Sequence, residues 1–324
     1  MSKKRNYLIL GFIFIIIASV IIIAIIRVSY KQPQLERINL RGDSQIGLNF
    51  IDYRPTFMYT SFQFIGDSSK TNIIIKLNKK DIVLNNNYYF GGFINDTLCI
   101  TFDLIGYCYL HTKKENDLFT QRLFNLSMYK FEFNLIKPSI LNNTIGFYFI
   151  DYEKLGFFDL KDSIILTLIK YDEFGKDYSE ISSFDIYNEV GVFCLKRDLI
   201  NNNFYFDFYL YDFKNNKTSF IIRTPKTQVL PNEPLVRFIN DTTVLASYYL
   251  NEKTLLYKID LLKNKVIETY NLEKNKVIIN ISSNKKDMIY LTLLNEKVRD
   301  SLSINNNNVE RGMYGGINVY SFVP

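Results

Sequence analysis

The sequence has no tryptophan and only one histidine among its 324 residues. Because His111 is the only imidazole, metal sites built from several histidines and mechanisms that need two of them are excluded. The chain also lacks a Cys-x-x-Cys pair, a calcium loop of the Asp-x-Asp-x-Asp-Gly kind, a Gly-x-Ser-x-Gly motif and a glycine-rich phosphate loop. We therefore expect no cofactor and no metal. The catalytic residues are unknown, and an enzyme is less favoured than a binding protein.

Cysteine is scarce too, and its count of three is odd. A disulfide framework normally needs an even number. Cys99 and Cys108 would face each other across a hairpin that turns at Asp103–Gly106, provided that the register brings them opposite. The alternative, which we favour, is that Cys99, Cys108 and Cys194 are small buried apolar side chains.

A basic surface outside the N-terminus is also missing. The formal net charge is +6, but five of the 39 basic residues and none of the 33 acidic ones lie within residues 1–34, so the rest of the chain is nearly neutral. Binding to a nucleic-acid backbone normally needs a clustered basic face. We therefore exclude nucleic acid as a partner.

The N-terminal segment contains one long hydrophobic run. Residues 7–26 carry no charge, and a helix of this length spans about the 30 Å of a bilayer core. Three basic residues precede the run, and no small-x-small cleavage site or lipid-accepting cysteine follows it. We expect a signal anchor at 7–26, a cytoplasmic N-terminus at 1–6 and a linker at 27–34; a cleaved signal peptide is the alternative. The protein would cross the cell membrane once, with residues 35–324 in the periplasm or at the cell exterior.

The body of the chain contains internal repeats. "IGLNFIDY" from Ile46 and "IGFYFIDY" from Ile145 share six of eight residues, and "INDT" occurs at Ile94 and again at Ile239. Both spacings fit a unit of about 48 residues. This period places six equivalent strands along the chain, at Ile46–Tyr53, Leu98–Leu104, Ile145–Tyr152, Gly191–Asp198, Thr243–Leu250 and Ile289–Asn295.

Each unit also contains an outer hairpin, which is clearest between Leu255 and Leu272. Apolar and polar residues alternate there on both sides of a Lys-Asn-Lys turn, as in two paired strands. An aspartate, Asp260, precedes the turn. Its counterparts in earlier units are Asp212, Asp159 and, with a substitution, His111.

These polar residues are expected to shape turns. Aspartate side chains at such places accept hydrogen bonds from nearby backbone N–H groups. We expect the same of Asp96 and Asp241 in the two INDT copies. For His111, a turn position is the favoured prediction and a catalytic base is the alternative.

Six units of three or four short strands are typical of a β-propeller, in which small twisted sheets surround a central axis. The repeats and the Asp-then-turn hairpins of residues 35–324 resemble the six-bladed propellers of extracytoplasmic bacterial proteins, although the absence of tryptophan separates the chain from the tryptophan-aspartate propellers. We expect an all-β fold, a six-bladed β-propeller preceded by a single transmembrane helix, with paired β-sandwich domains as the alternative. The segment Leu35–Leu40 would close the ring by pairing with the C-terminal strand.

A propeller without a catalytic motif favours a function in binding. We expect a membrane-anchored, non-catalytic binding or scaffold module for a protein or glycan partner. The alternative is a carbohydrate hydrolase or lyase, which would need two carboxyl groups about 5 to 10 Å apart in the central funnel. Most tyrosine and phenylalanine side chains are expected to fill the spaces between blades rather than to bind sugars or peptides.

Overall fold

The computed structural model describes residues 30–323 with several gaps, and most of this part of the chain is in β-strands. The one helix among the described residues is a short 3-10 helix, η3 (Tyr171–Phe174). The expected membrane anchor at 7–26 lies outside them, and within them no helix is long and apolar enough to span a bilayer. The larger gaps are 39–50, 126–135, 284–288 and 296–316, and shorter stretches are missing elsewhere.

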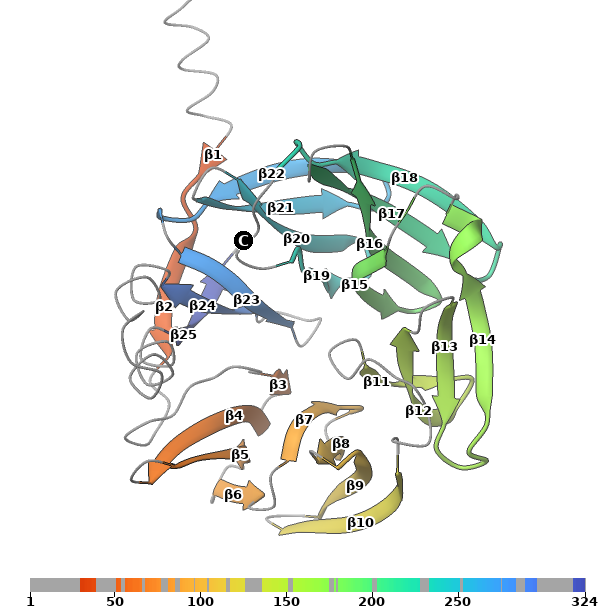
Figure 1. Ribbon diagram of the computed structural model, residues 1–324, viewed down its shortest axis with the longest axis vertical. Helices are drawn as coiled ribbons and strands as arrows, with labels where there is room; N and C mark the ends of the chain where they lie inside the picture. Colours follow the sequence, from red (N-terminus) through yellow and green to blue (C-terminus); the bar gives the residue numbers. More distant parts are fainter. Residues whose placement is uncertain are drawn as a thin grey trace, which may run out of the picture.

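The described strands form six sheets arranged around a common axis, five with four strands and one with five (Figure 1). We number the sheets in chain order. The first contains β3 (Ile51–Tyr53), β4 (Thr56–Ile65), β5 (Ser68–Lys76) and β6 (Asp81–Leu84); the second β7 (Tyr88–Phe93), β8 (Leu98–Asp103), β9 (Tyr107–Lys114) and β10 (Asp117–Asn125); the third β11 (Lys137–Leu141), β12 (Thr144–Ile150), β13 (Lys154–Asp159) and β14 (Ile165–Lys170). The fourth contains β15 (Glu180–Tyr187), β16 (Val190–Asp198), β17 (Phe204–Asp212) and β18 (Lys217–Arg223); the fifth β19 (Val236–Asn240), β20 (Thr243–Leu250), β21 (Lys253–Asp260), β22 (Lys265–Asn271) and β1 (Tyr30–Lys31); the sixth β23 (Lys276–Ser283), β24 (Ile289–Asn295), β25 (Ile317–Val323) and β2 (Gln34–Ile38).

The apolar cores lie between neighbouring sheets, as β16 illustrates. Val192 and Cys194 pack against the fifth sheet, whereas Phe193 and Leu195 pack against the third. A strand covered on both faces needs apolar residues at successive positions, which explains the uninterrupted run in this strand. Residues two apart share a face, so one strand contributes to two cores.

Five such clusters join neighbouring sheets from the first to the sixth. Aromatic rings meet across them: the ring centroids of Phe102 and Phe147, from the second and third sheets, are 5.6 Å apart in an edge-to-face contact. The all-β propeller and the packing role of the aromatic residues are therefore confirmed, and paired β-sandwich domains are not observed. The count of six blades stays a prediction, because most side chains of the first sheet lie outside the described part and the packing that would join it to the sixth sheet is not seen.

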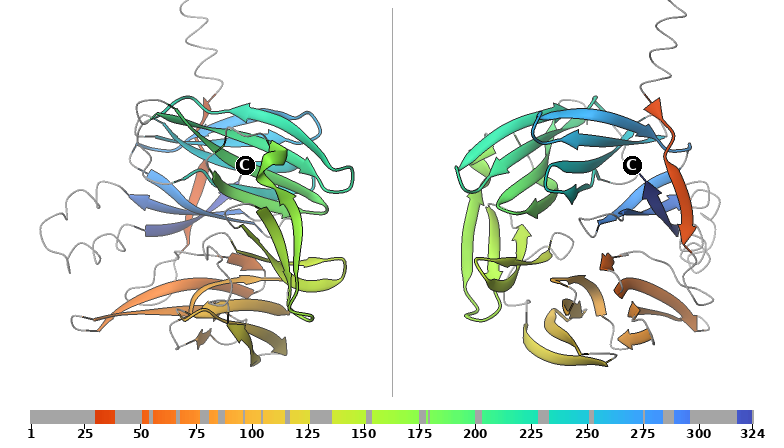
Figure 2. Two further views of the ribbon diagram at one scale, coloured as in Figure 1. Left: turned by 45° about the vertical axis from the view of Figure 1, so that its right-hand side comes forward. Right: turned by 180° about the vertical axis from the view of Figure 1, so that it is seen from behind.

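The two ends of the described chain meet in the sixth sheet. β2 pairs antiparallel with β25, with Leu35 opposite Phe322, which confirms the closure expected of this segment. β1 adds to the edge of the fifth sheet, where Tyr30 lies opposite Thr269 in a parallel pair. Seen from behind, β1 and β2 follow each other along the outside of the ring (Figure 2). The described fold thus begins inside the stretch 27–34 that the sequence suggests as a linker.

The repeat is reproduced with one correction. The hairpin between Leu255 and Leu272 is formed by β21 and β22. The strands β8, β12, β16, β20 and β24 are all second strands of their sheets, so these five are equivalent, as expected. The segment Ile46–Tyr53 is different. Its described part, β3, is the first strand of its sheet and pairs only with β4. Its similarity to the segment from Ile145 thus relates a first strand to a second strand, and apolar strand patterns alone do not distinguish the two.

The cysteines form no disulfide. Cys99, Cys108 and Cys194 are buried and free, and Phe102, not Cys99, lies opposite Cys108 across the hairpin. Burial raises the pKa of all three thiols, so they stay protonated. The expectation of small buried apolar side chains is confirmed.

Candidate functional site at the ring centre

The first strand of each sheet lies next to the axis of the ring (Figure 1). Such an inner strand pairs with a partner on one side only, so the backbone N–H and C=O groups along its other edge need other partners. Side chains from neighbouring inner strands supply several of them. The inner strands are β3, β7, β11, β15, β19 and β23.

Asp185 on β15 is fully buried and joins three sheets. Its Oδ2 atom accepts the backbone N–H of Phe238 on β19 at 2.8 Å. Its Oδ1 atom forms an ion pair with Lys137 on β11 and accepts the N–H of Ile186 at 2.8 Å. Both carboxylate oxygens are thus occupied and the charge is balanced. Asp185 therefore links the third, fourth and fifth sheets.

Two serines precede Asp185 on β15. Ser183 Oγ accepts the backbone N–H of Val236 on β19 at 3.2 Å. Ser182 lies at a bulge and has no partner residue on β16, and its buried Oγ atom forms no hydrogen bond in the described structure. The extra residue of a bulge turns the strand locally, and here both Ser183 and Asp185 reach β19.

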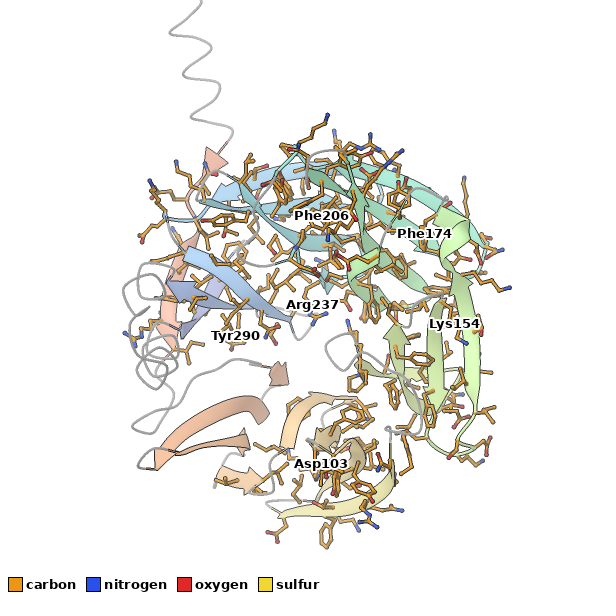
Figure 3. The ribbon with its side chains drawn as sticks, in the orientation of Figure 1. Asp103, Lys154, Phe174, Phe206, Arg237 and Tyr290 are labelled. Carbon is orange, nitrogen blue, oxygen red and sulfur yellow. The ribbon has the colours of Figure 1, made fainter. Side chains whose placement is uncertain are left out.

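Arg237 on β19 holds a positive charge at the ring centre. Its Nε atom donates to the C=O of Ile281 on β23 at 2.9 Å. Figure 3 shows Arg237 close to the middle of the ring. No described carboxylate forms an ion pair with it. Burial lowers the pKa of the Arg237 guanidinium to about 10, so the group remains charged at neutral pH.

Asp185 and Arg237 occupy the same place in their sheets. Asp185 lies opposite Val192, and Arg237 lies opposite Leu245. Each of these partners is two positions after the first residue of the second strand in its sheet. In the second sheet, Gly92 holds this place. A Cβ atom on Gly92 would lie 2.9 Å from Cγ of Pro138 on β11, so the third sheet packs directly on the glycine backbone. At this equivalent position, the side chain therefore accepts a hydrogen bond from the next sheet in one case and donates one in another. In the third case, a glycine lets the next sheet pack on the backbone.

The outer hairpins use the same chemistry each time. Asp159, Asp212 and Asp260 lie at the ends of strands β13, β17 and β21, and each accepts backbone N–H bonds from its own turn, which confirms the prediction. Four residues further on, each turn has a residue with a positive φ angle. These residues are Ser163 (55°), Asn216 (50°) and Asn264 (49°).

The two INDT copies are equivalent turns between first and second strands, but asparagine does the bonding. Oδ1 of Asn95 and of Asn240 accepts the backbone N–H two residues further on, at 2.9 and 3.0 Å. Asp241 lies in the turn, as predicted, but the bonding expected of its side chain is wrong, because the oxygen that accepts the N–H belongs to Asn240. Asp96 lies outside the described residues.

His111 does not lie at a turn, so that prediction is wrong. It is fully buried within β9, where Nε2 lies 2.7 Å from Oγ1 of Thr101 on β8 and Nδ1 lies 2.8 Å from Oγ1 of Thr120 on β10. The outer hairpin of the second sheet turns only after Lys114, so counting back from the other aspartates misplaced His111. Burial lowers its pKa to about 4, which keeps the imidazole neutral. The ring is enclosed by the sheet, which argues against a catalytic base.

A second charged cluster lies in the fourth sheet. Asp207 on β17 is fully buried and accepts two bonds from Arg223, from Nε at 2.7 Å and from Nη2 at 2.8 Å. Tyr178 also donates to Asp207, and the Arg223 guanidinium lies 4.2 Å from the centre of the Tyr205 ring. The hydrogen bonds to Asp207 raise the pKa of Arg223. The charges of this cluster are therefore balanced internally.

Apart from His111 as an alternative catalytic base, the sequence predicts no site residue, whereas the structure brings Lys137, Asp185 and Arg237 to the inner strands. A usable signal is present, because Asp185 lies between Phe184 and Ile186, and Arg237 lies between Val236 and Phe238, so each charge has apolar neighbours on both sides. Asp185 contacts a lysine and backbone N–H groups but no second carboxylate. In the described part of the chain, no three His, Cys, Asp or Glu side chains are grouped to hold a metal ion.

No protein-family model matches the chain, and no curated protein matches it in sequence. Two solved structures show a distant likeness. A crystal structure of a nidogen/laminin complex has 9% identity and a TM-score of 0.41, covering 68% of this chain and 77% of that one. The β-propeller domain of the trilobed protease from Pyrococcus furiosus has 8% identity and a TM-score of 0.44, covering 82% of this chain and 90% of that one. Neither likeness indicates a function.

Proposed function

We propose that this protein is a membrane-anchored, extracytoplasmic, six-bladed β-propeller that acts as a non-catalytic binding or scaffold module for a protein or glycan partner. The proposal rests on the way in which the carboxylate of Asp185 is bonded. It is the one described carboxylate that joins the inner strands, and Lys137 and two backbone N–H groups occupy both of its oxygens. A carboxylate held in this way is poorly suited to transfer protons, which favours a binding function over catalysis.

The proposed architecture explains how the ring closes and where it lies. The pairing of β2 with β25 joins the two ends of the chain, as closure of a six-bladed ring requires. Only residues 27–29 separate the expected anchor from β1, and three extended residues span about 10 Å. The fifth sheet, whose edge β1 extends, would therefore lie next to the membrane surface.

Affinity capture from detergent-solubilised membranes tests the binding function. The full-length protein should repeatedly recover the same protein or glycan companion. The control is Asp198→Asn, a change to an exposed carboxylate at the end of β16. This variant should recover the same companion as the wild type. Repeated recovery without a specific companion would contradict the proposal.

Protease accessibility tests the proposed location. Protease added to intact spheroplasts should digest residues 35–324 and spare a cytoplasmic control protein, and the intact protein should stay in the membranes through a carbonate wash. Protection of the body would reverse the orientation. A mature N-terminus near residue 30 would show that the anchor is a cleaved signal.

A further inference from the structure

The outer turn of the fifth sheet exposes a leucine. Leu262, in the turn between β21 and β22, is 82% exposed, the highest value among the large apolar residues that the structure describes. It follows Asp260 by two residues, and the same position in the third and fourth sheets holds Lys161 and Lys214, both exposed. These two hairpins form with a lysine at this position, so the fold does not require Leu262.

Two more exposed apolar side chains lie beside this turn. Asn264 of the turn donates from Nδ2 to the C=O of Phe220 on β18 at 2.7 Å, and Phe220 is 46% exposed. Ile267 is 41% exposed and lies at a bulge of β22, where it has no partner residue on β21. We call Phe220, Leu262 and Ile267 the rim patch. A single exposed apolar residue needs no explanation, whereas a group of them marks a contact surface.

The turns that carry the rim patch are basic. Asp260–Lys265 contains two lysines and one aspartate, a net charge of +1, and Asp212–Lys217 contains the same set. The equivalent turn of the third sheet, Asp159–Ile164, contains two aspartates and one lysine, a net charge of −1. Apolar side chains beside lysines suit an anionic lipid surface, because the apolar groups enter the interface and the lysines reach the headgroups.

The position of β1 favours lipid over a protein as the partner of the rim patch. β1 pairs with β22 through Tyr30 and Thr269, and Ile267 is two residues from Thr269. Only residues 27–29 separate β1 from the expected anchor at 7–26, and three extended residues span about 10 Å. Both ribbon figures show β1, β22 and β18 along the same side of the ring (Figures 1 and 2). A bilayer that holds the anchor is therefore within reach of this side.

From these observations we propose that the rim patch rests on the membrane, with Phe220, Leu262 and Ile267 at the lipid interface and the lysines of the two turns on anionic headgroups. The inference rests on the proposed function, because it requires the anchor. It also fixes the orientation of the ring. The second sheet, on the opposite side of the ring in Figure 1, would face away from the membrane and be open to a partner.

A fluorescent label on the full-length protein in lipid vesicles tests this contact. Leu262→Cys provides one reactive thiol, because Cys99, Cys108 and Cys194 are buried. The label is a nitrobenzoxadiazole group, and a nitroxide attached to the phospholipid quenches it on contact. Ile105→Cys is the matched control, because Ile105 is 70% exposed in a turn of the second sheet. We expect quenching at position 262 to be at least about twofold stronger than at position 105.

The charge of the lipid tests the role of the lysines. Quenching at position 262 should be stronger in vesicles that contain phosphatidylglycerol than in vesicles of phosphatidylcholine alone. Lys265→Gln should reduce this gain, whereas Lys161→Gln, in the turn of the third sheet, should leave it unchanged. Equal quenching in the two kinds of vesicle would contradict the proposed contact with anionic headgroups.

Two further results would overturn the inference. Equal quenching at positions 262 and 105 would show that the rim patch has no special contact with lipid. A blue shift of the label at position 262 without quenching by the nitroxide would place the label against protein, such as a second copy of this chain. A carbonate wash of the same vesicles separates the two proposals. Protein that stays in the membrane without quenching at position 262 contradicts the lipid contact alone, whereas protein that washes out contradicts the proposed anchor.

Discussion

The outer hairpins and the inner strands of this propeller follow opposite rules. At the outer turns, Asp159, Asp212 and Asp260 repeat one residue type with one bonding pattern. At the equivalent inner position, Gly92 and Asp185 contact the next sheet in different ways, and Arg237 differs from both. A turn must satisfy only its own backbone, so the same solution serves every sheet. An inner residue must fit a different neighbour each time, and this is where a repeated scaffold can become specific.

The largest expected effect comes from removing the inner carboxylate. Asp185→Ala leaves the Lys137 charge without its partner and the N–H of Phe238 without its acceptor. We expect a loss of about 3 to 5 kcal/mol in the free energy of unfolding, measured by urea denaturation at neutral pH. Asp198→Ala is the control, because its side chain is 58% exposed and lies 3.9 Å from Lys196. A loss below about 1 kcal/mol for Asp185→Ala would show that the inner strands do not depend on this link.

A second test uses His111, which the sequence groups with the outer aspartates and the structure places inside a sheet. Its pKa is lowered by burial from its ordinary value of about 6.5 to about 4, so the folded state favours the neutral ring. The unfolded chain binds the proton first as the pH falls. The stabilisation is therefore complete above pH 6.5 and is lost between about 6.5 and 4, by roughly 3 kcal/mol in total.

Comparing the wild type with His111→Gln isolates this contribution, because the carboxylates that titrate in the same range are common to both proteins. The difference between their unfolding free energies should change across this pH window and be constant above it. A constant difference throughout would place His111 in contact with water, as expected of a turn residue.

The sequence predicts well what depends on local chemistry. The Asp-then-turn pattern located Asp159, Asp212 and Asp260 correctly, and the uninterrupted apolar run of β16 follows from burial on both faces. The strand at Leu35 was also matched correctly to the C-terminal strand. The turns and the apolar run follow from the residue types themselves, and the pairing of the strand at Leu35 follows from the need to close the ring.

The sequence does not predict contacts that depend on the register between sheets. Nothing around Asp185 indicates that a backbone N–H of β19 and a lysine of β11 lie within its reach. The error at His111 has a related cause, because a hairpin longer by a few residues shifts every later position. The candidate site is made of such contacts, so it could not be located from periodicity alone.

An intermediate effect is expected at Gly92, the inner position that relies on having no side chain. Gly92→Val should destabilise the protein by about 1 to 3 kcal/mol, because its Cβ atom would lie 2.9 Å from the Pro138 ring, which cannot move aside easily. Urea denaturation measures the loss. Adding Pro138→Ala to Gly92→Val should recover part of it, since the smaller side chain makes room. Independent, additive losses would mean that the two residues do not meet.

The smallest effect is expected at an outer turn, where the repeat itself suggests an improvement. Asn216 and Asn264 hold the positive φ position in two turns, whereas the third has Ser163 with φ at 55°, a conformation that serine tolerates less well than asparagine or glycine. Ser163→Gly should raise the free energy of unfolding by about 0.5 kcal/mol, because relief of backbone strain exceeds the added entropy of the unfolded chain. Lys161→Gly in the same turn is the matched control and should lower stability slightly, since residue 161 has no positive φ angle to relieve. Equal effects of Ser163→Gly and Lys161→Gly would mean that the positive φ angle of Ser163 stores no strain. The residue type at this turn position would then be as free to vary as the residue types at the inner position.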